Sequence, residues 1–190
     1  MTRQLLFAFF LSLTATGSAA GSESIEKKVD QELIALLKTA ASEAESFEDH
    51  YDAQVWLASK DSPLSSMVKD RKERLNLLKL VHAEATRAGL LPEVVLAVIE
   101  IESHFDPYAV SHAGALGMMQ VMPFWKEEIG RPEDNLINTR TNLRYGCTIL
   151  KYYLDKENGR LADALARYNG SYGEYWYAER VLDAWDNHWR

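Results

Sequence analysis

The stretch that decides the fold runs from Leu90 to Ser103 and reads Leu-Leu-Pro-Glu-Val-Val-Leu-Ala-Val-Ile-Glu-Ile-Glu-Ser. Pro92 suits the first turn of a helix, where its missing N–H does no harm, and the residues after it are apolar almost all round. Such a helix belongs at the centre of a core. Glu102 near its end is then a desolvated carboxyl with a raised pKa, which makes it a candidate general acid.

Helical spacing of apolar residues continues on both sides of this stretch, and no alternating strand with a hairpin turn is found. Helices are expected over 69–87, stopped by Gly89, over 142–156, and from Leu161 to the Asn169-Gly170 pair. Gly114, Gly117 and Pro123 bracket a short methionine-rich helix or turn. The sequence therefore predicts an all-α domain over residues 66–190.

The part before this domain is predicted to be a helical extension over residues 21–65. It contains one or two amphipathic helices, broken at Asp61-Ser62-Pro63, because proline and the residue before it disfavour continuation. Packing against the following domain is the favoured role, and binding a protein of the cell envelope is the alternative.

Residues 1–20 resemble a secretory signal peptide. Arg3 supplies the positive charge, residues 5–13 the apolar core, and Ser18-Ala19-Ala20 the small-residue cleavage site. The sequence thus predicts export to the periplasm or cell envelope. A membrane anchor formed by the same segment is the alternative, although a spanning helix needs about 20 apolar residues.

Charge and cysteine content exclude some classes of function. Without Arg3 of the leader, 20 Lys and Arg stand against 28 Asp and Glu, a net charge of −8, which argues against a nucleic-acid partner. The lone Cys147 lies on an apolar helix face and is interpreted as a core thiol, with redox or nucleophilic chemistry as the alternative. The histidines do not follow a metal-ligand spacing, so no metal or cofactor is expected.

Two further acids lie close to Glu102 in the sequence. Glu100 is two residues away, and about 200° of helical rotation puts it on the opposite face, where it is expected to be solvated or salt-bridged. Asp106 precedes Pro107 and suits a turn cap at least as well as a place beside Glu102. No convincing partner for Glu102 is found.

Four motifs in order resemble the soluble lytic transglycosylase domain, a lysozyme-like helical fold that acts on peptidoglycan. They are Glu102-Ser103 with Phe105-Asp106-Pro107 and Ala109-Val110-Ser111, then Gly114-Ala115-x-Gly117-Met118-Met119-Gln120-Val121-Met122-Pro123, then Asn142-Leu143-Arg144-Tyr145-Gly146, and finally Ala166-Arg167-Tyr168-Asn169-Gly170. The likeness covers residues 75–170. Met118 replaces the more usual leucine, and the loop after Asn169 departs from the usual Ala-Gly ending.

The resemblance assigns a role to each matched position. It implies that Glu102 is the sole catalytic acid and base, that Ser111 contacts the acetamido group of the sugar, and that Tyr168 offers its hydroxyl toward the catalytic centre. The remaining implied substrate-binding residues are Gly117, Met118, Met119, Gln120, Met122 and Asn169.

The absence of a second acid also bears on the reaction. Hydrolysing glycosidases need a second carboxylate as base or nucleophile. One acid suffices when the C6 hydroxyl of the N-acetylmuramic acid closes on C1 and leaves a 1,6-anhydro end. The expected function is therefore a lytic transglycosylase acting, as a monomer, on peptidoglycan glycan strands. A hydrolytic muramidase and a catalytically silent glycan-binding scaffold are the alternatives.

The tail of the chain is rich in aromatic residues, which are interpreted as core or as sugar-stacking rings: Tyr172, Tyr175, Trp176 and Tyr177.

Overall fold

The computed structural model describes residues 35, 45–47 and 49–190 of the chain. All helices with described bounds lie in one compact unit, Leu36–Arg190. The predicted signal peptide and most of the predicted helices before residue 45 fall outside the described residues. In the part of the chain that is described, no helix has both the length and the apolar composition needed to cross a membrane.

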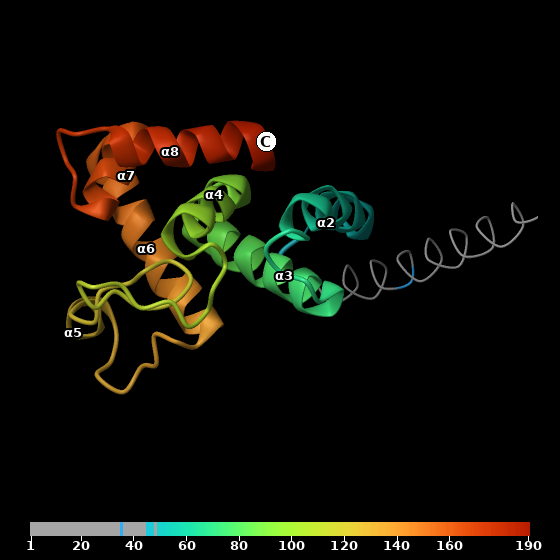
Figure 1. Ribbon diagram of the computed structural model, residues 1–190, viewed down its shortest axis with the longest axis horizontal. Helices are drawn as coiled ribbons and strands as arrows, with labels where there is room; N and C mark the ends of the chain where they lie inside the picture. Colours follow the sequence, from blue (N-terminus) through green and yellow to red (C-terminus); the bar gives the residue numbers. More distant parts are fainter. Residues whose placement is uncertain (1–34, 36–44, 48) are drawn as a thin grey trace, which may run out of the picture. The chain divides into compact units, whose positions relative to one another are not determined.

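Helix α4 (Pro92–Ser103) lies at the centre of this unit, between α3, α8 and the C-terminal helix (Figure 1). Pro92 starts the helix as expected, and six consecutive residues, 94–99, are buried on all sides. The helix ends at Ser103, and His104 caps it in a left-handed conformation. This central burial confirms the interpretation of the apolar stretch and fixes where Glu102 sits.

Helix α3 (Arg71–Ala88) packs against α4 and against α2 (His50–Leu64). Gly89 caps α3 with a φ of 71°, as the sequence predicts. The predicted break at Asp61-Ser62-Pro63 is wrong, because α2 continues through Pro63 to Leu64. Proline sits in the last turn and removes one hydrogen bond. The buried ion pair of Asp61 with Arg74, 2.6 Å apart, holds this turn against α3.

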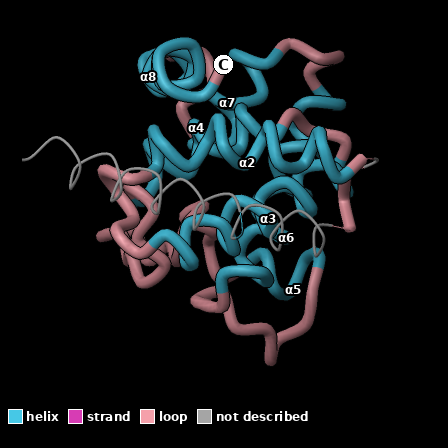
Figure 2. The backbone as a smooth tube through the Cα atoms, turned by 90° about the vertical axis from the view of Figure 1, so that its right-hand side faces the viewer, coloured by secondary structure: helices cyan, strands magenta, loops and turns pink. Residues whose placement is uncertain are grey.

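Helix α6 (Thr139–Lys156) crosses behind α3, and α7 (Leu161–Asn169) packs on it (Figure 2). Asn138 caps α6 through its side chain, and Gly170 ends α7 with a φ of 84°. The short α5 (Trp125–Ile129) precedes α6. These helices confirm the predictions for 142–156 and for the segment beginning at Leu161.

The segment between α4 and α5 is a turn-rich loop, so the methionine-rich region is a turn and not a helix. Two isolated bridges, Val110 with Leu116 and Leu116 with Val121, fold it back on itself. The side chain of Asn142 on α6 fastens it: its Oδ1 accepts from the N–H of Met119 at 2.7 Å, and its Nδ2 donates to the carbonyl of Leu116 at 2.8 Å.

The chain closes with α8 (Trp176–Ala184), which continues into a π-helical turn, η1 (Trp185–Trp189). Both elements pack along α4. Trp189 is completely buried and its ring contacts Phe105, the second of two consecutive non-glycine residues with positive φ after α4. Across the described residues the regular elements are all helices, which confirms the all-α prediction.

Candidate active site

A cavity of about 240 Å³ opens at the C-terminal end of α4, with Glu102 in its wall. Six predicted site residues from three parts of the chain meet there: Glu102, Ser111, Gln120, Met122, Tyr168 and Asn169. Trp125 and Ile149 complete the apolar side. The fold thus brings together residues up to 67 positions apart in the sequence, from the end of α4, the turn-rich loop and the end of α7.

Glu102 has the electrostatics of a proton donor. Burial raises the pKa of its carboxyl to about 7, while a hydrogen bond from Tyr177 and the charge of Arg180 lower it in part. At neutral pH the protonated and ionised forms are therefore both populated. A group that gives and later retakes a proton in one reaction needs this balance.

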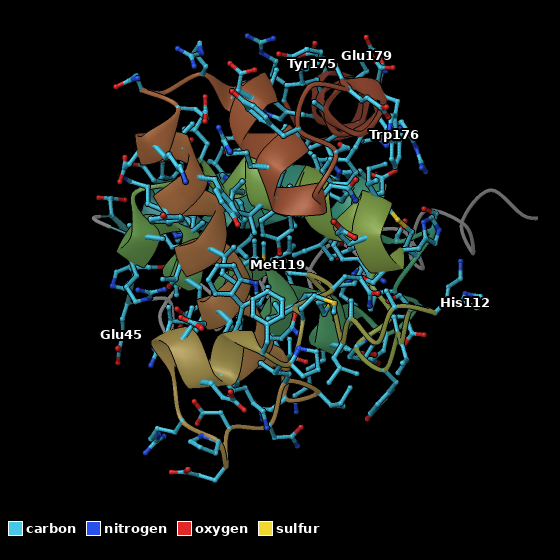
Figure 3. All side chains as sticks on the ribbon, turned by 90° about the vertical axis from the view of Figure 1, so that its left-hand side faces the viewer. Glu45, His112, Met119, Tyr175, Trp176 and Glu179 are labelled. Carbon is cyan, nitrogen blue, oxygen red and sulfur yellow. The ribbon has the colours of Figure 1, made fainter. Side chains whose placement is uncertain are left out.

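Tyr177, which the sequence grouped with the other tail aromatics as a core or sugar-stacking ring, contacts Glu102 directly. Its hydroxyl donates to Oε1 of Glu102 at 2.6 Å, and its ring is only 2% exposed. Among the aromatic residues of the tail, Trp176 is half exposed beside it, and Figure 3 shows Trp176 and Tyr175 at the surface.

Glu100 lies on the opposite face of α4, as helix geometry predicts. Its carboxylate accepts from Nε1 of Trp189 at 2.7 Å and contacts Nδ1 of His188 at 2.9 Å. It is thus bound by η1, and its side chain is only 12% exposed. Glu100 is thus held by η1 and is not solvated, and its contact with His188 is a salt bridge only when that histidine is protonated.

Asp106 serves as a turn cap. Its Oδ1 accepts from the N–H of Tyr108 at 2.8 Å, and its side chain does not line the cavity. Among the described residues, Glu102 is the one carboxylate in the cavity wall.

Three cavity residues use their polar groups within the protein. The Tyr168 hydroxyl donates to the carbonyl of Met119 at 2.7 Å, so it braces the loop and does not hydrogen-bond to Glu102. The Gln120 amide nitrogen donates to the carbonyls of Ala109 and Gly117. The Ser111 hydroxyl likewise accepts from the N–H of Ala115 at 2.9 Å. These hydrogen bonds hold the cavity wall in shape without a bound substrate.

Three residues expected in the groove lie outside this cavity. A Cβ at Gly117 would come within 2.6 Å of the Asn142 amide, so this glycine permits close packing and does not face the cavity. Met119 is fully buried against Gly146, and Figure 3 shows it in the interior. Met118 borders a different cavity near the start of α3. Packing against α6, which the sequence alone does not reveal, accounts for the burial of Gly117 and Met119.

Cys147 is a core residue, with no exposed surface and a pKa that burial raises to about 12. Within the described ranges, no three His, Cys, Asp or Glu side chains converge in the way that a metal site requires.

Comparisons with known proteins identify a family for this chain. Residues 79–182 match the family model described as Transglycosylase SLT domain. The membrane-bound lytic murein transglycosylase F of Desulfosudis oleivorans is 36% identical over 106 residues, which cover 54% of this chain and 23% of that protein. The membrane-bound lytic murein transglycosylase C of Yersinia pestis is 32% identical over 112 residues, covering 50% and 31%.

A solved structure of an inactive mutant of the lytic transglycosylase Slt from Pseudomonas aeruginosa matches 75% of this chain and 23% of its own, with 26% identity and a TM-score of 0.46. The chain thus spans less than a third of the length of each of these relatives. The family model itself covers more than half of the chain and includes Glu102 and every other predicted site residue. This protein belongs to the transglycosylase SLT domain family.

Proposed function

We propose that this protein is a peptidoglycan lytic transglycosylase, which cleaves the β-1,4 bond between N-acetylmuramic acid and N-acetylglucosamine without consuming water. The observation that carries the proposal is the Glu102 carboxyl, whose pKa is about 7. Among the described residues, no second carboxylate lines the cavity wall with it. The names of the relatives, lytic murein transglycosylases, support the same substrate class.

In the first step, protonated Glu102 gives its proton to the glycosidic oxygen as the bond from that oxygen to C1 of the muramic acid breaks. The Tyr177 hydroxyl occupies Oε1, so the proton is held on Oε2. The same hydrogen bond stabilises the carboxylate that remains after the transfer. The leaving sugar departs with a free C4 hydroxyl.

In the second step, the Glu102 carboxylate takes the proton from the C6 hydroxyl of the muramic acid, and the C6 oxygen bonds to C1. The product is a 1,6-anhydro end, and Glu102 is protonated again for the next cycle. One group acts first as acid and then as base, which a pKa near the working pH makes efficient at both steps.

Two alternatives use the same cavity. A hydrolytic muramidase needs a carboxylate that activates water or acts as nucleophile. Asp106 is the nearest candidate in sequence, but its Oδ1 is engaged in a turn and it lies outside the cavity wall. A silent glycan-binding scaffold has no need of a carboxyl whose pKa burial holds at about 7, because keeping it there costs stability.

We further infer that the protein works in the cell envelope, where its substrate lies. The membrane-bound relatives support this location, and the predicted signal peptide is consistent with it. Residues 21–65 remain the proposed extension, and within it α2 contacts α3 and η1. The remaining site proposals, Ser111 for the acetamido group and Gln120, Met122 and Asn169 for the sugar, rest on their place in the cavity wall.

Mass spectrometry of a murein digest tests this function. Products of the transglycosylase are one water lighter than hydrolytic products, so anhydro ends are expected throughout. Mainly hydrated reducing ends would point to the muramidase, and no release of fragments from sacculi would point to the scaffold.

A further inference from the structure

A hollow of about 400 Å³ opens where the C-terminal end of α3, the middle of α6 and the segment after α5 meet. We call it the arginine hollow, because three guanidinium groups line it, those of Arg87, Arg131 and Arg144. It is larger than the cavity at Glu102 and shares no lining residue with it. Its volume lies in the roughly 300–1,000 Å³ range of ligand pockets, and the reaction described above does not use it.

One buried carboxylate holds two of these arginines. The side chain of Glu84 is only 4% exposed; its Oε2 accepts from Nε of Arg87 at 2.6 Å, and its Oε1 accepts from Nη2 of Arg144 at 2.9 Å. Burial raises the pKa of Glu84, but the hydrogen bonds from Arg144 and Arg87 outweigh burial and keep that pKa below its usual value. Glu84 is therefore ionised at neutral pH. Both guanidinium groups are held before any ligand arrives, which lowers the entropic cost of binding one.

The third arginine comes from the loop after α5. Arg131 donates from Nη2 to Oδ1 of Asp134 at 3.3 Å, and the Tyr145 hydroxyl donates to Oδ2 of the same carboxylate at 2.6 Å. The loop needs its glycine at Gly130, since a Cβ there would lie 1.4 Å from the Tyr145 hydroxyl oxygen. The three arginines thus converge through the tertiary fold and not through a run of basic sequence.

The arginine hollow carries a surplus of one positive charge. Its three guanidinium groups stand against two carboxylates, those of Glu84 and Asp134. Glu133 also lies 3.7 Å from Nε of Arg131, but its side chain is 70% exposed, so solvent screens this pair. On a chain of net charge −7, such a site suits a single anion and not a polyanion such as nucleic acid, which the rest of the surface repels.

The donors that remain in the hollow fit a carboxylate. Across the described residues, acceptors are found for Nε and Nη2 of Arg87 and of Arg144, but not for their Nη1 groups. Each Nη1 carries two N–H donors, so the two guanidinium groups together can hold both oxygens of one carboxylate. Ile129 and Thr148 form an uncharged wall beside them. A carboxylate attached to a small uncharged body, such as the last residue of a peptide, matches this combination.

The arginine hollow lies close to the catalytic cavity along two helices. On α5, Trp125 lines the cavity, and Ile129, about one turn of 5.4 Å later, lines the arginine hollow. On α6, Ile149 lines the cavity and its neighbour Thr148 lines the hollow. An extended peptide covers about 3.3 Å per residue. A peptide of a few residues, attached to the sugar at Glu102, therefore spans the step from the cavity to the hollow.

We propose that the arginine hollow binds the C-terminal carboxylate of a peptide that the glycan strand carries on its muramic acid. This inference rests on the proposed function, because it assumes that the strand enters the cavity at Glu102. It adds a recognition element: the protein prefers murein whose peptides end in a free carboxylate over bare glycan. A protein C-terminus offers the same group, and chirality separates the two sources, because murein peptides end in D-alanine.

The test measures binding of acetyl-D-Ala-D-Ala to the full chain by NMR titration, with its C-terminal amide and acetyl-L-Ala-L-Ala as comparison ligands. The free acid should shift the Nε–H signals of Arg87 and Arg144. It should bind at least about tenfold more tightly than the amide, which lacks the charged acceptor. It should also bind more tightly than the L,L peptide. An amide of equal affinity, or an L,L peptide that binds as well or better, would overturn the proposal.

Two substitutions locate the bound peptide. Arg144→Gln and Arg131→Gln should each weaken binding of the D,D peptide about tenfold. Arg131→Gln leaves the contacts of Glu84 untouched, so its result decides the matter if Arg144→Gln unfolds the chain. Arg160→Gln is the matched control and should leave the affinity unchanged, because Arg160 is likewise an exposed arginine paired with a buried glutamate, Glu157, and lies outside the hollow. A folded Arg131→Gln variant that binds the peptide like wild type contradicts the assignment.

Failure of this proposal and failure of the proposed function give different results. The peptides contain no sugar, so their binding does not depend on turnover. If sacculi yield anhydro products while the D,D peptide does not bind, the arginine hollow proposal fails and the function stands. If the peptide binds while sacculi release nothing, the function fails, and with it the link between the hollow and a cleaved strand.

An active enzyme allows one more measurement. Arg131→Gln should raise KM for peptide-bearing murein about fivefold and leave kcat unchanged. For glycan strands stripped of their peptides, both values should match those of wild type. An equal rise in KM for stripped strands would show that the substitution acts on glycan binding and would overturn the proposal.

Discussion

The last turn of α4 carries two glutamates with opposite surroundings, and their difference explains which one we propose as the catalytic acid. Glu100 faces η1, where Trp189 and His188 offer it two donors. Glu102 faces the cavity, where burial outweighs the single hydroxyl of Tyr177 and the charge of Arg180. Both residues are glutamates, and both lie on α4. The different surroundings of the two carboxyl groups therefore come from the partners that the C-terminal segment brings to each face of α4.

The largest expected effect comes from removing the acid on the cavity side. Glu102→Gln should lower the release of muropeptides from sacculi by at least about 10³-fold, because an amide can neither give nor retake the proton. Binding of oligosaccharides should persist, since Gln keeps the shape and the acceptor for Tyr177. Glu100→Gln is the control, and its activity should stay within about threefold of wild type. Near-normal turnover by Glu102→Gln would show that the acid is elsewhere.

The same substitution should remove the contribution of Glu102 to the pH dependence of stability. Burial raises the pKa of Glu102 from 4.5 to about 7 on folding. The folded state thus binds this proton more tightly, and the stability contributed by the protonated form is lost as pH rises from about 4.5 to about 7. Between pH 4 and pH 8 the unfolding free energy of wild type should therefore fall by about 3 kcal/mol relative to that of the Glu102→Gln variant, which lacks the titrating group. If wild type and variant differ in unfolding free energy by the same amount at pH 4 and pH 8, the raised pKa is contradicted.

On the other face, Glu100→Ala should act on stability and hardly on chemistry. It leaves the Nε1–H of the completely buried Trp189 without its acceptor, which costs roughly 1–3 kcal/mol of unfolding free energy. Urea denaturation measures this loss. Glu100→Gln keeps an acceptor and should recover most of it. Turnover at a temperature where both variants are folded should remain within about threefold of wild type.

The smallest expected change comes from the donor to Glu102. Tyr177→Phe removes a hydrogen bond that favours the ionised carboxyl, so the pKa of Glu102 rises. The alkaline limb of the pH–activity profile should move up by about one pH unit. Tyr145→Phe is the matched control, because its buried ring and its hydroxyl bond to Asp134 lie away from the cavity. A limb that stays in place would mean that Tyr177 serves packing alone.

Local signals predicted much of this fold. The positive φ values at Gly89 and Gly170 end α3 and α7 where the sequence places their ends, and Pro92 begins α4. The burial of Glu102 followed from the apolar helix that carries it. Each of these features depends on neighbours within a few residues, which is the range over which a sequence pattern is informative.

Contacts between distant segments were not predictable in the same way. Tyr177 reaches Glu102 across 75 positions, and nothing in its own stretch distinguishes it from the exposed Trp176. The continuation of α2 through Pro63 depends on the pairing of Asp61 with Arg74 of another helix. In both cases tertiary packing decides what local propensity leaves open.

The fastening of the turn-rich loop by Asn142 has a consequence for hydrogen exchange. The amide of Met119 has no place in a helix or strand, yet it donates to a completely buried side chain in the middle of the core. It can exchange with solvent only when the loop separates from α6. We therefore expect Met119 to be protected like a core helical amide, so that the turn-rich loop opens together with the most stable part of the protein.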